Sequence, residues 1–138
     1  MARESWDTYF MLIAKQVASR STCPRAAVGA VIVKDNHILS TGYNGAPAGE
    51  LHCTDVGCQM INGHCERTVH AETNAVVQAA RFGIAVQGAT MYCWSNRNLS
   101  GDIELEAVGH AVPQCIKCNQ VMKQAGIVRY VEGGKDLY

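Results

Sequence analysis

The sequence has no long apolar run, no excess of charge of one sign and no internal repeat. No stretch approaches the roughly 18 apolar residues of a membrane span, so we expect no membrane-spanning segment. The 12 basic and 12 acidic side chains cancel, which argues against a wide nucleic-acid-binding surface, because such binding depends on neutralising phosphates. The charges around the first apolar residues argue against a signal peptide, and we expect a cytoplasmic protein.

Periodicity and turn residues predict a single α/β domain over residues 1–138. Helices are expected over three ranges: 5–20, 70–81 and 115–125. Strands are expected over four ranges: 27–33, 37–41, 89–94 and 127–131. Their alternation after the first hairpin predicts a partly parallel sheet covered by helices. The apolar residues Trp6, Phe10 and Ile13 of the first helix are expected to pack in the core.

Cysteine is abundant for a chain of this size. In a reducing compartment, clustered cysteines mixed with histidines are more often metal ligands or catalytic groups than disulfides. The seven are Cys23, Cys53, Cys58, Cys65, Cys93, Cys115 and Cys118. Cys93, at the end of a predicted strand, is expected to be buried and inert.

One group of residues has the pattern of a catalytic metal site. His70 supplies a nitrogen ligand, and Cys115 and Cys118, three apart at the start of a predicted helix, supply two sulfurs. Three protein ligands leave a position open for water, whose pKa a zinc ion lowers to about 7. Glu72, two residues after His70, is then free to transfer protons beside that water.

This pattern, H-x-E followed by P-C-x-x-C, resembles the signature of zinc nucleobase deaminases. Five further segments make the chain similar to deoxycytidylate deaminases, a resemblance that spans about residues 20–131. They are VGAVIV at 28–33, GYNGAPAG at 42–49, HC at 52–53, CERTVHAETNA at 65–75 and GATMYC at 88–93. Two features depart from the pattern, because Gln114 separates Pro113 from Cys115 and the long segment 94–114 separates Cys93 from Cys115. The excursion over 95–112 is interpreted as a lid or an oligomer contact.

The resemblance implies a three-layer α/β/α fold of the cytidine-deaminase type, with a mixed central sheet flanked by helices. It also implies zinc-dependent hydrolysis of dCMP to dUMP and ammonia, supplying dUMP for thymidylate synthesis. Activation by dCTP, inhibition by dTTP, magnesium on the triphosphate effector and a homo-oligomer, often a hexamer, are further implications.

The remaining cysteines suggest a second zinc site that would organise the turn-rich segment 42–68. The resemblance implies that the ligands of this site include one cysteine before the VGA strand, one after GYNG and others before HAE. The favoured ligands are Cys23, Cys53, Cys58 and either Cys65 or His64. The alternative is that one or two of these cysteines are simply buried.

Candidates for nucleotide binding lie on either side of the first hairpin. Arg25 is the preferred ligand for the substrate phosphate, because arginine can bind phosphate with two hydrogen bonds, although arginines are usually solvated or paired surface groups. Asn44, within Gly42-Tyr43-Asn44-Gly45, is expected to contact substrate or effector on the strength of the resemblance, the alternative being a plain tight turn.

The predicted mechanism is attack of activated water on C4 of cytosine, while Glu72 protonates N3 and then the departing amine. Two rival enzymes share the motifs, a tRNA adenosine deaminase and a free cytidine deaminase. The neutral charge disfavours the polynucleotide substrate. A non-catalytic zinc-stabilised binding module is the third alternative, but it leaves Glu72 without a role.

Overall fold

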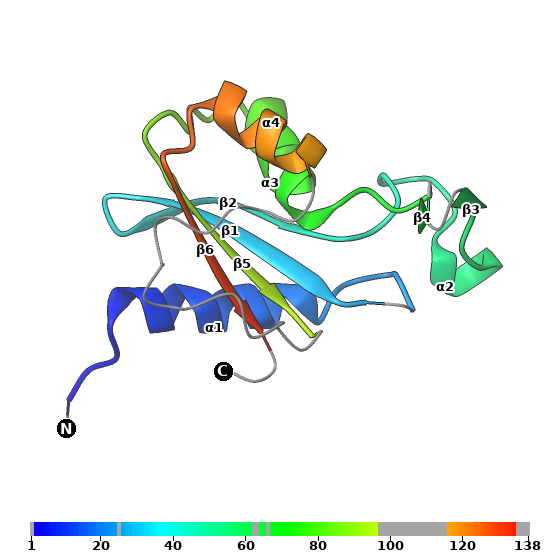
Figure 1. The fold of residues 1–138 in the computed structure, drawn as a ribbon, viewed down its shortest axis with the longest axis horizontal. Helices are drawn as coiled ribbons and strands as arrows, with labels where there is room; N and C mark the ends of the chain where they lie inside the picture. The colour runs from blue at the N-terminus through cyan, green and yellow to red at the C-terminus, as the bar shows by residue number, and fades with distance from the viewer. Residues whose placement is uncertain (1, 25, 62–63, 66, 97–115, 135–138) are drawn as a thin grey trace.

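The computed structural model describes residues 2–24, 26–61, 64–65, 67–96 and 116–134. The predicted helices and strands are present, with three small elements added between the first hairpin and the second long helix (Figure 1). In chain order the elements are α1 (Trp6–Ala18), β1 (Val28–Lys34), β2 (His37–Tyr43), α2 (Cys53–Val56), β3 (Met60–Ile61), β4 (His64–Cys65), α3 (Ala71–Arg81), β5 (Thr90–Ser95), α4 (Ile116–Ala125) and β6 (Arg129–Gly134).

The central sheet is mixed, with the strand order β2-β1-β5-β6. Strand β1 is antiparallel to both β2 and β5, whereas β5 and β6 are parallel. The predicted parallel pairing is therefore confirmed for β5 and β6. Helix α1 covers one face of the sheet, and α3 and α4 cover the other (Figure 1). This arrangement confirms the predicted mixed sheet between two helical layers.

Burial on both faces explains why β1 reads as a continuous apolar run. Alternate side chains of a strand point to opposite faces, so Ala30 and Ile32 pack beneath α3, while Val31 and Val33 pack on α1. A strand covered by helices on both sides has no solvent face to mark with polar residues.

Helix α1 begins where the sequence predicts, because Ser5 is its N-cap and the Ser5 Oγ accepts a hydrogen bond from the Thr8 N–H at 3.1 Å. Phe10 is buried in the core, as predicted. The prediction for Trp6 is wrong, since this side chain is 54% exposed. It lies in the first turn, where it stacks on Phe10 with ring centroids 5.6 Å apart instead of entering the core.

The β1–β2 hairpin turns at Asp35 and Asn36, whose φ angles of 52° and 60° give both residues the left-handed conformation of a tight hairpin turn. Strand β2 runs two residues beyond the predicted end, since Gly42 and Tyr43 pair with Ala30 and Gly29. Gly42 carries no side chain that could mark it as a strand residue, which is why the pattern stops short.

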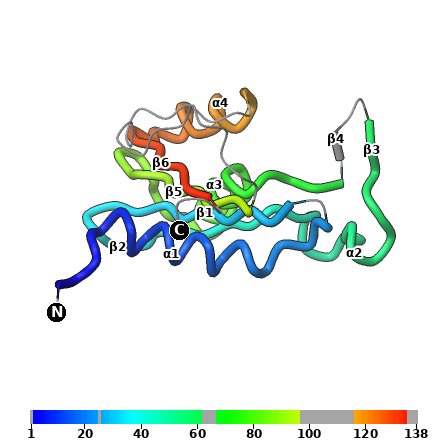
Figure 2. The backbone as a smooth tube through the Cα atoms, turned by 60° about the horizontal axis from the view of Figure 1, so that its bottom comes forward, coloured from blue at the N-terminus to red at the C-terminus, as the bar shows by residue number. Residues whose placement is uncertain are grey.

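The segment between β2 and α3 forms an arm at one end of the sheet (Figures 1 and 2). It contains α2 and the β3–β4 hairpin, whose two strands pair Met60 with Cys65 and Ile61 with His64. Several of its apolar side chains are exposed: Leu51, Val56, Met60 and Ile61. The arm therefore contributes little to the two apolar clusters that flank the sheet.

Gly42 sets how closely α3 approaches the sheet. A Cβ at this position would lie 2.4 Å from the Ala75 nitrogen and 2.5 Å from the Ala71 oxygen. Gly42→Ala is therefore expected to lower the free energy of unfolding by about 2 kcal/mol or more, because the backbone of α3 must move away. Urea unfolding measures this loss.

The matched control is Gly49→Ala, where an added methyl group meets no atom within 4 Å but the φ of +89° is unfavourable. Its cost should be about 1 kcal/mol, from the backbone conformation alone. Equal losses in the two variants would contradict the close approach of α3.

Candidate functional site

The first turn of α3 holds His70 and Glu72. His70 is the N-cap of the helix, and the preceding residue, Val69, exchanges two backbone hydrogen bonds with Gly45 at 3.1 and 2.9 Å. The Asn74 side chain donates to the backbone oxygens of Tyr43, at 2.8 Å, and Val69, at 3.3 Å. These contacts fix the entry to the helix against the end of β2.

The first turn of α4 brings Cys118 to His70. The distance from His70 Nδ1 to Cys118 Sγ is 3.3 Å, and Thr73 Oγ1 lies 3.4 Å from the same sulfur. For one tetrahedral zinc ion, with Zn–N of about 2.0–2.1 Å and Zn–S of about 2.3 Å, the two donor atoms would be about 3.6 Å apart. The pair therefore fits two ligands of a shared ion, with a threonine hydroxyl placed to hydrogen bond to the sulfur.

Glu72 is beside this pair but directed into the protein. It is 7% exposed, and the thiol of Cys93, on β5, lies 3.6 Å from Glu72 Oε1. Cys93 is buried, as predicted, and burial raises the pKa of its thiol well above the usual value, with the negative charge of Glu72 adding to the effect. The Cys93 thiol is therefore neutral and can donate to the carboxylate.

A second carboxyl group, Glu132 on β6, approaches the same region. Glu132 pairs with Cys93 across the parallel strands, so the two side chains lie on the same face of the sheet. Glu132 Oε2 is buried and has no hydrogen-bond partner among the described residues. Burial first, and the negative charge of Glu72 second, raise the pKa of Glu132 to about 7.

This raised pKa predicts how stability depends on pH. The native state favours protonated Glu132, so its stabilising contribution is complete below about pH 4.5 and is lost as the pH rises through about 7. The groups that face it are Glu72, Cys93 and Tyr130. Glu132→Gln should therefore match the wild type near pH 5 and be more stable by about 1 to 2 kcal/mol at pH 8, after allowance for solvent screening.

Urea unfolding of both proteins at pH 5 and pH 8 measures this difference. The control is Glu50→Gln, a change at an exposed residue, which should have the same small effect at both pH values. A Glu132→Gln effect that is independent of pH would contradict the predicted ionisation.

Some of the predicted site residues lie outside the described residues. They are Arg25 and Cys115, together with the side chains of His64 and Cys65. Among the residues that the structure does describe, no group of three histidine, cysteine or acidic side chains is close enough to hold a metal ion. The pairing of His70 with Cys118 is the part of the predicted catalytic site that the structure brings together.

The predicted second site is represented by three described cysteines. Cys53 is buried, and Cys23 and Cys58 are half-buried. The backbone of Thr22, next to Cys23, accepts a 3.2 Å hydrogen bond from Thr54, next to Cys53. The chain segments that carry Cys23 and Cys53 are therefore adjacent.

Asn44 has a structural role that the motif alone did not reveal. Its side chain is buried, accepts a hydrogen bond from Val28 N at 2.9 Å and donates one to Ala26 O at 2.8 Å. It thus joins the end of β2 to the start of β1. The predicted contacts of Gly42, Tyr43, Asn44 and Gly45 with a nucleotide stay predictions.

Three residues of the site were not predicted from the sequence. Thr73 contacts the Cys118 sulfur, Asn74 fixes the loop before His70, and Cys93 contacts Glu72. Thr73 and Asn74 directly follow the H-A-E motif and are polar residues in the first turns of a helix. Cys93 offered no such signal, because a cysteine in an apolar strand has the pattern of an ordinary core residue.

Comparison with known proteins identifies similar sequences and a similar fold. Residues 4–133 match the family described as the cytidine and deoxycytidylate deaminase zinc-binding region. The chain is 44% identical, over 98% of its length, to ComE operon protein 2 of Bacillus subtilis, and 41% identical, over 67% of its length, to deoxycytidylate deaminase of Saccharomyces cerevisiae. It spans 64% and 31% of those two proteins, respectively.

The fold is similar to that of the dCMP deaminase from cyanophage S-TIM5, solved in complex with dCMP and dUMP. The TM-score is 0.70 at 23% sequence identity, over 99% of this chain and 88% of the other. This likeness confirms the predicted fold class. Within the described part of the chain, no helix combines the length and hydropathy of a membrane span.

Proposed function

Because the chain belongs to the cytidine and deoxycytidylate deaminase family, we propose that it catalyses the hydrolysis of dCMP to dUMP and ammonia. The observation that carries the proposal is the distance of 3.3 Å between His70 Nδ1 and Cys118 Sγ, beside the buried carboxylate of Glu72. The yeast relative is named for this activity, and the cyanophage protein of similar fold was solved with this substrate and product.

We assign His70, Cys115 and Cys118 as the ligands of a catalytic zinc ion. Such an ion would activate a water molecule for attack on C4 of the cytosine ring. The His70–Cys118 geometry fits a shared tetrahedral ion. Both residues lie in the first turn of a helix or at its cap, where the helix dipole favours a thiolate over a thiol.

Glu72 is assigned as the proton carrier. Its place two residues after His70 puts it next to the proposed ligands without making it one of them. The carboxylate takes a proton from the water that attacks C4 and passes it to N3 of the base. It then takes the proton of the new C4 hydroxyl group and passes it to the departing amine, which leaves as ammonia. Burial of Glu72 keeps this proton transfer away from bulk water.

The finer features of the activity are also proposals. We propose that dCTP activates the enzyme and dTTP inhibits it, with magnesium bound to the triphosphate effector. We also propose that the protein is a homo-oligomer, with a hexamer favoured, and that it is cytoplasmic. Arg25 is proposed to bind the substrate phosphate, and the Gly42–Gly45 segment to contact substrate or effector.

A second zinc ion is proposed in the arm, held by Cys23, Cys53, Cys58 and either Cys65 or His64. The adjacency of the Cys23 and Cys53 segments supports it, as does the need of a long irregular segment for an internal link. Zinc analysis should therefore give two ions per chain, and Cys23→Ser should lower this to one. A single zinc ion per chain in the wild-type protein would contradict the second site.

Ammonia release from dCMP, cytidine and dCTP by the zinc-loaded protein tests the proposed reaction. We expect preference for the monophosphate, with the rate raised by added dCTP and lowered by dTTP. Preference for cytidine would assign the protein to the free cytidine deaminases. Failure to deaminate any of these three compounds, combined with zinc in closed four-ligand sites only, would favour a binding module.

A further inference from the structure

The buried carboxylate of Glu72 is contacted by a side chain of the central sheet. The contact comes from Cys93, whose sulfur lies 3.6 Å from Glu72 Oε1. Glu72 and Cys93 belong to α3 and β5, which are packed against each other in the same apolar cluster. The contact therefore joins the helix that carries Glu72 to the centre of the fold.

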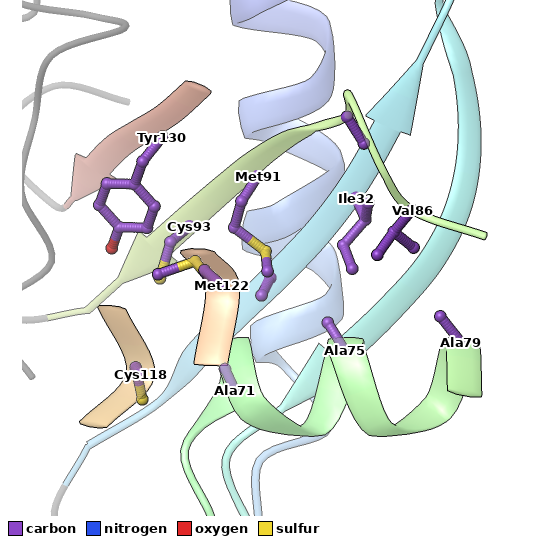
Figure 3. Close-up of a cluster of buried hydrophobic side chains, with 12 residues drawn as sticks. Ile32, Ala71, Ala75, Ala79, Val86, Met91, Cys93, Cys118, Met122 and Tyr130 are labelled. Atoms are coloured by element: carbon purple, nitrogen blue, oxygen red, sulfur yellow. The ribbon is translucent and has the colours of Figure 1, made fainter. Parts of the chain in front are cut away.

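Tyr130, on β6, is a neighbour of Cys93 in the same buried cluster. The register pairs Tyr130 with Met91 and Glu132 with Cys93, so Tyr130 is the diagonal neighbour of Cys93 on the same face of the sheet. Figure 3 shows these two side chains together in the cluster that also contains Cys118 and Met122. Tyr130 is itself buried, so its hydroxyl depends on partners inside the protein.

We propose that Cys93 and Tyr130 are positioning residues for Glu72. The tyrosine hydroxyl donates to the cysteine sulfur, and the thiol donates to Glu72 Oε1, which restricts the rotation of the carboxyl group and leaves Oε2 free for proton transfer. This inference rests on the proposed function, because it assigns the proton-transfer role to Glu72. It replaces the interpretation of Cys93 as an inert core residue.

Two substitutions of Cys93 separate positioning from simple packing. Cys93→Val fills a similar volume but has no hydrogen-bond donor. Cys93→Ser keeps a hydrogen-bond donor, although its C–O bond is shorter than the C–S bond of cysteine. If Cys93 only fills space, valine should serve at least as well as serine. Tyr130→Phe removes only the hydroxyl group, which is the first donor in the proposed series of hydrogen bonds.

Steady-state kinetics with the zinc-loaded enzyme and dCMP give the first test. We expect Cys93→Val to lower kcat about 3- to 10-fold, the effect of one hydrogen bond from a weak thiol donor, with KM within about twofold of wild type. Cys93→Ser should recover most of this loss, and Tyr130→Phe should lower kcat by a smaller factor. Met91→Leu, a volume-conserving change of a buried residue on the same strand, is the control and should keep the wild-type kcat.

The double variant Cys93→Val, Glu72→Gln tests the dependence on Glu72. In the Glu72→Gln background, Cys93→Val should cause no further loss of the residual rate, because the group that it positions has lost its function. An unchanged kcat in Cys93→Val, a serine variant as slow as the valine variant, or the same loss in both backgrounds would each overturn the inference.

Equilibrium unfolding keeps this test separate from the proposed activity. In a cycle of Cys93→Val, Glu72→Ala and their combination, the expected coupling is a 2- to 10-fold factor in the folding equilibrium constant. Absence of coupling overturns the contact between Cys93 and Glu72 whether or not dCMP is the substrate. Coupling without any dCMP turnover in the wild-type enzyme would support the contact and overturn the proposed reaction.

Discussion

Replacing Glu72 with glutamine is expected to lower kcat for dCMP by about 10³-fold or more while the zinc content stays at the wild-type value. Removal of a general acid–base typically costs about 10²- to 10⁴-fold, and here one residue carries both proposed proton transfers. Glutamine has nearly the same shape as glutamate, so the first turn of α3 should stay in place. Single-turnover deamination and zinc analysis of the same preparation measure both quantities.

The companion variant is Glu72→Asp, which keeps a carboxyl group at a shorter reach. It should recover part of the rate if proton transfer is the function of Glu72. A Glu72→Gln enzyme with a near-normal rate would remove this residue from the mechanism. Loss of zinc from Glu72→Gln would instead give the carboxylate a role in holding the metal.

Cys118→Ala is expected to remove one zinc ion per chain and to abolish deamination. The sulfur lies 3.3 Å from His70 Nδ1, and the residue is only 2% exposed, so water has little access to replace it as a ligand. His70→Ala should have the same two effects. Because zinc binds the native state in preference to the unfolded chain, both variants should also lose the stabilisation that zinc gives to the wild type.

Two neighbouring substitutions calibrate this result. Thr73→Val removes the hydroxyl 3.4 Å from the Cys118 sulfur and should weaken zinc binding by about 10- to 100-fold without abolishing it. Met122→Leu, one turn further along α4 and also buried, should leave the zinc content unchanged. A Cys118→Ala protein that keeps full zinc occupancy and activity would show that the His70–Cys118 pair is not the catalytic metal site.

The long helices and strands could be predicted because their patterns are local. Ser5 caps α1 by bonding to a backbone group three residues away, and the left-handed turn at Asp35–Asn36 suits two residues that tolerate positive φ. The end of β2 was missed because Gly42 owes its place to the approach of α3, from a distant part of the sequence. Trp6 was misplaced because periodicity gives the direction of a side chain but not the extent of the sheet beneath it.

For the candidate site, sequence was informative about residue types and less so about contacts. Only a few kinds of metal or catalytic site have the spacings seen for His70, Glu72 and the two cysteines. Cys93 was predicted to be inert, and the structural hydrogen bonds of Asn44 were not predicted. Their hydrogen bonds, from Cys93 to Glu72 and between Asn44 and the first residue of β1, join segments that are distant in the sequence.

The sequence by itself determined the order of helices and strands, the apolar faces that they bury and the side chains that we propose for metal binding and proton transfer. These properties depend on the spacing of apolar residues, with periods of two and 3.6 residues, and on the chemistry of individual side chains. Both can be recognised from residues that are close together in the sequence. Only the tertiary structure decided that α3 and α4 present His70 and Cys118 to each other, and that β5 and β6 place Cys93, Tyr130 and Glu132 beneath Glu72. Those contacts depend on strand order, register and interatomic distances of a few ångströms, which arise only when distant segments pack together.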